Sequence, residues 1–464
     1  METRFPEQNE RDKILNIRED HFYDLKSARI KPATLQEAFV SFANTDGGEL
    51  YVGVEDPDFL GERIVGFRKQ EDANDIIHTI LEETEPSVEN IEIEFIDFGT
   101  ERGLVLHISI PKSPKVHYTT QKKCYTRVNA RKKEIKGDRI LALSYSKGSY
   151  SYEKQAVDNL EIEDIVDSIH FNSYLNRVES TLEPVIFLRK QRLLTKKEGE
   201  NLPNVGCTLL FDEEPQASLD TRCAIKIYRL RTTSSEYKRE QLEERPHTIK
   251  GPLEKMIQDS LNKVDQILAN ASYNVSGKLE KLNYPTEAIK EIIVNAVIHR
   301  DYSLNDDIHI KIYDNRIEVF SPGKLPGFMT IENIYDERYS RNPNIVRMLH
   351  NLPNPVNHDI GEGLNTAKNE LRKVGLVEPD IIESENGLKV IIKHEKLAVL
   401  EDIILEYLQS NPGSLIANRD VRKISGENDV NKVKKAFQKL RSSGLIEPEN
   451  AKARTFDFKY KLKN

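Results

Sequence analysis

The stretch that decides the fold of this chain is EIIVNAVIHRDY, residues 291–302. Its apolar residues recur at helical spacing, which predicts a helix with one face packed on a core. On the opposite side, Glu291, Asn295 and His299 repeat every four residues. A carboxylate, an amide and an imidazole in line suit a helix that covers a sheet with one face and contacts a nucleotide with the other.

The residues that follow predict a two-layer α/β sandwich. Residues 306–320 alternate apolar and polar side chains on both sides of a turn at Asp314, which predicts an antiparallel hairpin. A helix is expected to begin at Pro343 with Asn342 as its cap. Residues 388–392 are expected to form a closing strand, and helices alternating with antiparallel strands build such a sandwich.

Residues 291–302 resemble the N box of the GHKL ATPases, the superfamily of DNA gyrase, mismatch-repair MutL and histidine kinases. Nearly the whole chain is similar to bacterial proteins described as RecG-like helicases or putative transcriptional regulators. The resemblance implies a multidomain α/β (α+β) protein. Its expected parts are a Schlafen AlbA_2-like domain (1–148), an α/β connecting region (149–275), a GHKL-like ATP-binding domain (276–396) and a winged helix-turn-helix (397–464).

The GHKL resemblance also implies residue roles. Glu291 would be the general base that orients the attacking water, and Asn295 would bind Mg²⁺, which takes few protein ligands. Where other members carry an Asp that binds the adenine amino group, this chain has Ser321, so ATP binding is expected with slow hydrolysis at most. Two glycines would let phosphate approach a helix N-terminus. The residues expected to bind the nucleotide are Asn295, His299, Asp301, Ser321, Gly323, Gly361 and Gly363.

The N-terminal part predicts a small α/β domain. Pro32–Ala43 has helical spacing and precedes the strong breaker Asn-Thr-Asp-Gly-Gly at residues 44–48. Residues 22–26, 49–55 and 105–111 alternate as strands do. With REDHFYDLKSA, AFVSFANTDGGELYVGVED and PKVHY…YTRVN, this series resembles the Schlafen AlbA-type domain.

In nuclease members of the Schlafen group, three carboxylates hold a divalent metal. The resemblance puts Glu19, Asp24 and Asp56 at those positions, with Glu55 as an alternative to Asp56. Hard oxygen ligands suit Mg²⁺ or Mn²⁺, which can activate water for phosphodiester cleavage. Lys26 would stabilise the developing charge. The family usually has Glu where this chain has Asp24, and the alternative is that these acids are solvated charges on a domain that only binds nucleic acid.

The net charge of −8 does not indicate nucleic-acid binding, but residues 112–139 hold ten Lys and Arg against two acids. Aromatic residues lie among them, as in surfaces that stack unpaired bases on aromatic rings: His117, Tyr118 and Tyr125. The cations expected to contact nucleic acid are Lys122, Lys123, Arg127, Arg131, Lys132 and Lys133. The alternative is a basic hairpin on the domain surface.

The connecting region carries little chemistry. Residues 163–175 and 251–271 are expected to form helices, and residues 204–211 and 222–230 are expected to form strands.

The C-terminal part resembles a winged helix-turn-helix. Three helices are expected, at residues 397–410, 418–424 and 428–443, followed by two strands that pair as a wing. The third helix would enter a DNA major groove, where Lys434, Lys435 and Gln438 would contact phosphates or bases. The alternative is a winged helix used for protein contact or dimerisation.

A length of 464 residues suits roughly three domains at ~150 residues each. Membrane helices, a signal peptide, a disulfide framework and a Cys metal site are not predicted, so a cytoplasmic location is expected. No GxxxxGK[ST] motif occurs, so a P-loop motor is not predicted.

Three functions remain open. The first is a nucleotide-responsive DNA-binding regulator, in which ATP changes dimerisation or domain arrangement, so a homo-oligomer is expected. The second is a Schlafen-like metal-dependent nuclease acting on tRNA or phage nucleic acid and gated by ATP. The third is a scaffold subunit with a protein partner in a defence complex. The regulator is preferred, because binding demands less of the residues than catalysis does.

Overall fold

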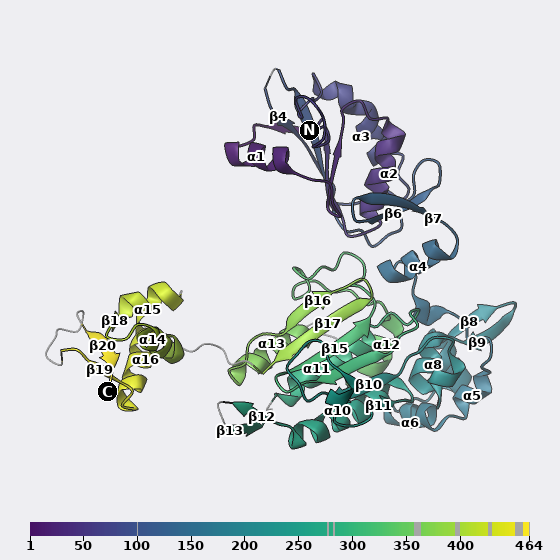
Figure 1. Cartoon of the computed structure of the whole chain (residues 1–464). Helices are drawn as coiled ribbons and strands as arrows, with labels where there is room; N and C mark the ends of the chain where they lie inside the picture. Colours follow the sequence, from purple (N-terminus) through teal and green to yellow (C-terminus); the bar gives the residue numbers. More distant parts are fainter. Residues whose placement is uncertain are drawn as a thin grey trace. The chain divides into compact units, whose positions relative to one another are not determined.

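A computed structural model describes residues 1–99, 101–275, 278–281, 284–356, 363–394, 400–425, 429–450 and 458–463 (Figure 1). The chain forms two compact units, one made of Met1–Leu371 with Glu378–His394 and the other of Arg372–Val377 with Glu395–Asn464. Helices and several separate sheets are present in the described residues, which confirms the multidomain mixed α/β class. No described helix is both long and apolar enough to cross a membrane.

The first unit begins with a five-stranded sheet in the order β1-β4-β5-β3-β2. Helices α2 and α3 pack on one another, and their apolar residues share a core with this sheet. The predicted helix and strands of this region are confirmed. The strands are β1 (Glu2–Arg4), β2 (Tyr23–Lys26), β3 (Gly48–Val52), β4 (Glu92–Asp97) and β5 (Leu104–Ile110). The helices are α1 (Gln8–Asn16), α2 (Pro32–Ala43) and α3 (Asn74–Leu81), with the short turn η1 (Gln70–Ala73) before α3.

The breaker after α2 anchors the next part of the chain. Asn44 is buried, its side-chain amide donates to the carbonyls of His117 (2.8 Å) and Tyr125 (3.0 Å), and its oxygen accepts the His117 N–H (2.8 Å). These bonds hold the hairpin of β6 (Cys124–Val128) and β7 (Arg131–Ile135) against α2. Helix α4 (Asp138–Lys147) follows and ends at Gly148, which has a left-handed φ of 72°.

The connecting region is mainly helical, and one prediction there is wrong. Residues 204–211 form helix α8 (Val205–Phe211), with the Asn204 side chain accepting the Cys207 N–H (2.9 Å) as its cap. Every residue of α8 is buried, and an apolar run buried on all sides does not distinguish a helix from a strand. The other elements are η2 (Tyr152–Lys154), α5 (Ile162–Val166), α6 (Ile169–Arg177), α7 (Pro184–Lys190), β8 (Leu194–Lys197), β9 (Glu200–Pro203) and α9 (Pro215–Ser218).

The largest sheet has six strands in the order β11-β10-β14-β15-β17-β16. The predicted hairpin is confirmed, with Ile310 opposite Val319 and Ile312 opposite Ile317. Two of its strands come from the region expected to be a connector, and one of them runs parallel to β14. The strands are β10 (Ile225–Arg229), β11 (His247–Ile249), β14 (Ile308–Ile312), β15 (Arg316–Pro322), β16 (Asp380–Glu383) and β17 (Gly387–Lys393).

Helices pack on this sheet and complete the sandwich. Helix α10 contacts β10, helix α11 contacts β15, and the two helices contact each other (Figure 1). Helix α11 covers residues 286–298 and so includes the deciding stretch as far as Ile298, with Ile289, Ile292, Ile293 and Val297 buried as predicted. The helices are α10 (Leu253–Asn270), α11 (Thr286–Ile298), α12 (Pro343–His350) and α13 (Gly363–Lys373). Smaller elements are η3 (Arg239–Gln241) and the hairpin β12 (Ser272–Val275) with β13 (Lys278–Lys281).

Helix α12 begins at Pro343 as predicted, but the Asn342 side chain does not cap it. The Asn342 amide instead donates to the carbonyls of Ile298 (3.0 Å) and Arg300 (2.8 Å), which ties α12 to the end of α11. Glu153 caps the helix from a distant part of the chain, because its carboxylate accepts the N–H groups of Asn344 (2.9 Å) and Ile345 (3.0 Å). Local sequence cannot reveal a cap that comes from so far away.

The second unit has a small core of its own, with Ile404, Leu408, Val433, Phe437 and Leu440 buried together. The three predicted helices and the strand pairing of β19 with β20 are present. Whether the unit is a DNA-binding winged helix stays a prediction. Its elements are α14 (Leu400–Ser410), β18 (Ile416–Ala417), α15 (Asn418–Ser425), α16 (Val430–Ser442), β19 (Ile446–Pro448) and β20 (Lys459–Leu462), with the sheet order β18-β20-β19.

The Glu153 cap gives a stability prediction. Glu153 is 0% exposed, so Glu153→Ala leaves two buried N–H groups without their acceptor. We expect the free energy of unfolding to fall by about 2–4 kcal/mol, measured by urea denaturation. Glu163→Ala, at an exposed position of α5, is the matched control and should change it by less than about 0.5 kcal/mol. Equal stability of the two variants would show that the cap is dispensable.

Candidate functional site

A cavity of about 340 Å³ lies against α11 and is called the α11 cavity here. It is formed by α11, β15, β17, the segment after β15 and the start of α13. The predicted general base Glu291 lines it together with five of the residues predicted to bind nucleotide: Asn295, His299, Ser321, Gly323 and Gly363. Gly361, also predicted, lies outside the described residues.

The polar end of the α11 cavity is a close approach between two helices. Glu291 is 8% exposed, and Asn295 lies one turn further along the same helix. A Cβ atom added to Gly363 would lie 2.5 Å from Glu291 Oε2 and 2.7 Å from Asn295 Nδ2. Only glycine therefore lets the start of α13 come this near to the carboxylate and the amide without displacing them.

The rest of the α11 cavity is largely apolar. Its walls include Ile292 from the core face of α11, Val319 from β15, and Leu388 and Val390 from β17. A cavity of this size, with apolar walls and a few convergent polar groups, is typical of a small-molecule site. The flat ring of a ligand can pack against such walls while the charged part of the same ligand lies near Glu291, Asn295 and Gly363.

Ser321 has a specific structural role at this cavity. Its hydroxyl donates to the carbonyl of Ala296 (2.7 Å) and so joins β15 to α11. The GHKL resemblance predicted that this serine stands in place of an adenine-binding Asp, but its one donor is already used. Toward a ligand it can act only as an acceptor.

Asp301 does not line the α11 cavity, so its predicted role in nucleotide binding is corrected. Its carboxylate forms a buried ion pair with Arg341 (2.8 Å), and each side chain is 2% exposed. The other carboxylate oxygen accepts from the hydroxyl (2.6 Å) and the N–H (3.0 Å) of Ser303. Arg341 also donates to the carbonyls of Tyr145 (2.7 Å) and Lys324 (2.6 Å). The ion pair of Asp301 with Arg341 therefore joins the segment after α11 to α4 and to the segment after β15.

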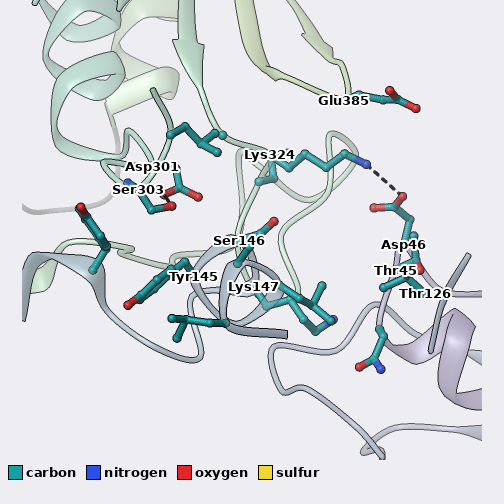
Figure 2. Close-up of a pocket in the computed structure, with 18 of the residues that line it drawn as sticks. Thr45, Asp46, Thr126, Tyr145, Ser146, Lys147, Asp301, Ser303, Lys324 and Glu385 are labelled. Atoms are coloured by element: carbon teal, nitrogen blue, oxygen red, sulfur yellow. Dashed lines mark hydrogen bonds and ion pairs between the residues drawn. The ribbon is translucent and has the colours of Figure 1, made fainter. Parts of the chain in front are cut away.

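A second cavity, of about 450 Å³, is called the junction cavity and is shown in Figure 2. It is lined by residues that follow α2 and β5, by α4, and by the segments after α11 and β15. Gly323, Lys324 and Leu325 line both cavities. Three of its residues are lysines from distant parts of the sequence: Lys112, Lys147 and Lys324.

Few carboxylates lie close to the three lysines of the junction cavity. Asp46 lies 3.3 Å from Lys324, 4.0 Å from Lys112 and 2.9 Å from His21. Lys112 also donates to the carbonyls of Leu325 (2.9 Å) and Met329 (3.1 Å). Burial raises the pKa of Asp46, but Lys324 and the hydrogen bond from His21 outweigh it, so the pKa lies below its usual range.

Lys147 is the most buried of the three, at 5% exposed. Its ammonium donates to the carbonyl of Ala43 (2.9 Å). Burial and, to a smaller extent, the nearby Lys112 lower its pKa to about 7, although Asp46 and Cys124 act in the opposite direction. Sequence analysis missed this group, because nothing in local spacing connects lysines that lie 35 and 177 residues from Lys147.

The predicted nuclease residues are only partly brought together. Lys26 Nζ lies 2.9 Å from both Glu19 Oε1 and Asp24 Oδ1. Burial raises the pKa of Asp24, whereas for Glu19 the hydrogen bonds from Lys26 and Asp24 outweigh burial and lower the pKa. Asp56 instead accepts the N–H of Asp58 (3.1 Å) in its own loop. In the described part of the chain, no three His, Cys, Asp or Glu side chains are placed to hold a metal ion.

Arg127 was predicted to contact nucleic acid, and the structure contradicts this. Its side chain is buried and donates to the carbonyls of Asp20 (2.7 Å) and Tyr23 (3.0 Å) and to Asp24 (3.3 Å). Its guanidinium lies 4.3 Å from the centre of the Phe42 ring. Arg127 therefore holds β2 and α2 together.

Other predicted residues of the basic stretch differ in availability. Lys132 pairs with Glu37 (2.6 Å), Lys122 pairs with Glu85, and Lys123 is half-buried. Arg131 and Lys133 on β7 are exposed. His117 and Tyr125 are buried and hydrogen-bonded, so they cannot stack on bases as predicted. The candidate surface here is smaller than the sequence indicated.

Helix α16 separates its two faces as predicted. Val433, Ala436, Phe437 and Leu440 are buried, and the opposite face exposes Lys434, Lys435 and Gln438. Their contact with nucleic acid stays a prediction.

Comparison with known proteins adds two domain matches. Residues 19–136 match the family described as Schlafen, AlbA_2, and residues 305–392 match the family described as putative ATP-dependent DNA helicase recG C-terminal. The DIP2311 protein from Corynebacterium diphtheriae, known from a crystal structure, is 18% identical, with a TM-score of 0.38 over 96% of this chain and 92% of that chain. No curated protein matches.

Burial of Lys147 gives a pH prediction. Between pH 7 and the ordinary lysine value of 10.5, the unfolded chain binds a proton at this side chain that the folded chain does not. Stability from this group therefore rises with pH across that window and is lost as the pH falls to about 7. We expect the free energy of unfolding to rise by about 3 kcal/mol more in the wild type than in Lys147→Met between about pH 6.5 and 9.5.

Urea denaturation at several pH values would measure this difference. Lys190→Met, at an exposed position of α7, is the control and should follow the wild type. Parallel pH profiles for the wild type and Lys147→Met would contradict the prediction.

Proposed function

We propose that this chain, which carries a Schlafen AlbA_2 domain and a recG-type ATPase domain, is a nucleotide-responsive regulator that binds DNA. ATP with Mg²⁺ would occupy the α11 cavity, and its presence would change how the protein binds nucleic acid. The observation that carries the proposal is the meeting of Glu291, Asn295 and Gly363 at the polar end of one cavity.

The residues of the α11 cavity fit this cofactor. The apolar walls suit a purine ring, and the first turn of α13, which lines the cavity, offers backbone N–H groups to phosphates. Asn295 would bind Mg²⁺, and Glu291 would orient a water molecule. Bound Mg²⁺ would neutralise phosphate charge. Because the Ser321 hydroxyl already donates to Ala296, we expect weak selectivity for adenine over other bases.

The output is assigned to the second unit. Helix α16 exposes Lys434, Lys435 and Gln438 on one face and packs its other face on the core, which is the arrangement that a recognition helix needs. Cations on such a face neutralise phosphates and make binding depend steeply on salt. We expect ATP to act through dimerisation or domain arrangement, and so expect a homo-oligomer. A scaffold role with a protein partner is the alternative.

The nuclease alternative has less support. Lys26 bridges the carboxylates of Glu19 and Asp24, but among the described residues Asp56 does not join them as the third metal ligand that the resemblance implied. Asp24 is also bound by Arg127. These ion pairs with Lys26 and Arg127 are consistent with a structural role for Glu19 and Asp24.

Nucleotide binding can be tested with Gly363→Ala. The added methyl group would crowd Glu291 and Asn295, so we expect the affinity for ATP with Mg²⁺ to fall at least tenfold, measured by isothermal titration calorimetry. Asn369→Ala, at an exposed position on the same helix, is the matched control and should bind as the wild type does. Unchanged binding in Gly363→Ala would remove the nucleotide from the α11 cavity.

DNA binding can be tested with the double variant Lys434→Ala/Lys435→Ala. Loss of two phosphate contacts should weaken binding to duplex DNA roughly 10–100-fold and lower the salt dependence by about two contacts, measured by fluorescence anisotropy. Arg189→Ala/Lys190→Ala removes an equally exposed basic pair from α7 and serves as the control. ATP should shift DNA affinity in the wild type but not in Gly363→Ala, and equal DNA binding by both double variants would refute the assignment to α16.

A further inference from the structure

The junction cavity is a second concave site with chemistry of its own. At about 450 Å³ it is large enough for a mononucleotide-sized molecule. Its lining is apolar along Leu141, Leu143 and Leu304, and polar where lysines and hydroxyl groups meet. Figure 2 shows the Lys324 side chain pointing toward Asp46.

Few carboxylates lie near the lysines at the polar end. Asp46 and Glu383 are the two carboxylates near the three ammonium groups, and Glu383 lies 4.0 Å from Lys112. Asp46 is shared with His21 as well. Lys147 forms no ion pair with any described residue, and its hydrogen bond is to a carbonyl.

The remaining acids of the cavity do not restore the balance. Asp301 is neutralised by Arg341 at 2.8 Å. Asp138 and Glu385 are exposed, so water and salt screen their charges. A buried ammonium with no carboxylate partner is costly, so Lys147 is easily deprotonated, and an anion that reaches it favours the protonated form.

We propose that the junction cavity binds a phosphate-bearing small molecule of mononucleotide size. Its phosphate would lie between Lys147 and Lys324, where ammonium groups act as point charges for phosphate oxygens. The hydroxyl of Ser146 supplies a further donor. The organic part would pack along the apolar wall of α4. This proposal does not depend on nucleotide binding in the α11 cavity.

The test uses adenosine monophosphate as probe and isothermal titration calorimetry on the full chain carrying Gly363→Ala, which is expected to weaken binding in the α11 cavity. In this background we expect Lys147→Met to weaken binding at least tenfold. Ser146→Leu retains all three lysines but fills the cavity, and should have a similar effect. Neither residue lines the α11 cavity, so loss of binding in these variants identifies the junction cavity even if the α11 cavity binds no nucleotide.

The controls separate phosphate recognition from other effects. Lys190→Gln, on the exposed face of α7, should bind adenosine monophosphate unchanged. Adenosine should bind at least tenfold more weakly than adenosine monophosphate, and inorganic phosphate should compete with it. Absence of binding in the Gly363→Ala background would overturn the proposal, and so would an affinity in Lys147→Met and Ser146→Leu equal to that of the Gly363→Ala parent.

Discussion

The buried ion pair between Asp301 and Arg341 is the interaction on which both cavities depend. Asp301 lies three residues after the end of α11, and the Arg341 guanidinium that pairs with it also binds the carbonyls of Tyr145 on α4 and Lys324 after β15. One side chain thus joins three segments that line the two cavities. Charges buried this completely are retained when every member is paired, and removal of one partner from such a pair costs about 3–5 kcal/mol. The Asp301–Arg341 ion pair therefore fixes these three segments, which form part of the walls of the two cavities.

Glycine has a complementary role at the same place. Gly323 has a φ of 110°, and a Cβ atom there would lie 2.5 Å from Asp301 Cβ. The chain can therefore turn tightly against Asp301 and still present Lys324 to the junction cavity. At the other cavity Gly363 permits the approach of α13 to Glu291. The lack of a side chain at Gly323 and at Gly363 therefore helps to shape the two cavities.

The sequence predicted those parts of the structure that local periodicity determines. The two faces of α11, the β14–β15 hairpin and the inward and outward faces of α16 all follow from spacing alone. The Glu291, Asn295 and Gly363 group was also anticipated, because it lies on one helix and at one helix start. Prediction failed where burial is complete, as in α8, whose apolar residues show no period because every side is covered.

Charge was the least reliable guide. Arg127 and Lys132 count toward the basic stretch, yet one is buried beneath β2 and the other pairs with Glu37. Asp301 resembled a ligand residue in sequence and is an internal counter-ion instead. Lys147 and Asp46 gave no signal, because their environment arises only when α2, β5, α4 and the segment after β15 come together. The composition gives the number of charged side chains, but the tertiary contacts determine which of them are exposed to solvent or to a ligand.

The segment from Gly323 to Leu325 is a wall common to both cavities, and Lys112 holds it by the carbonyl of Leu325. A ligand that moves this wall from one side changes the free energy of binding on the other side. Thermodynamic linkage makes such an effect reciprocal: whatever factor the first ligand imposes on the affinity of the second, the second imposes on the first. The sign of the cooperativity is then set by whether the two ligands favour the same position of three residues.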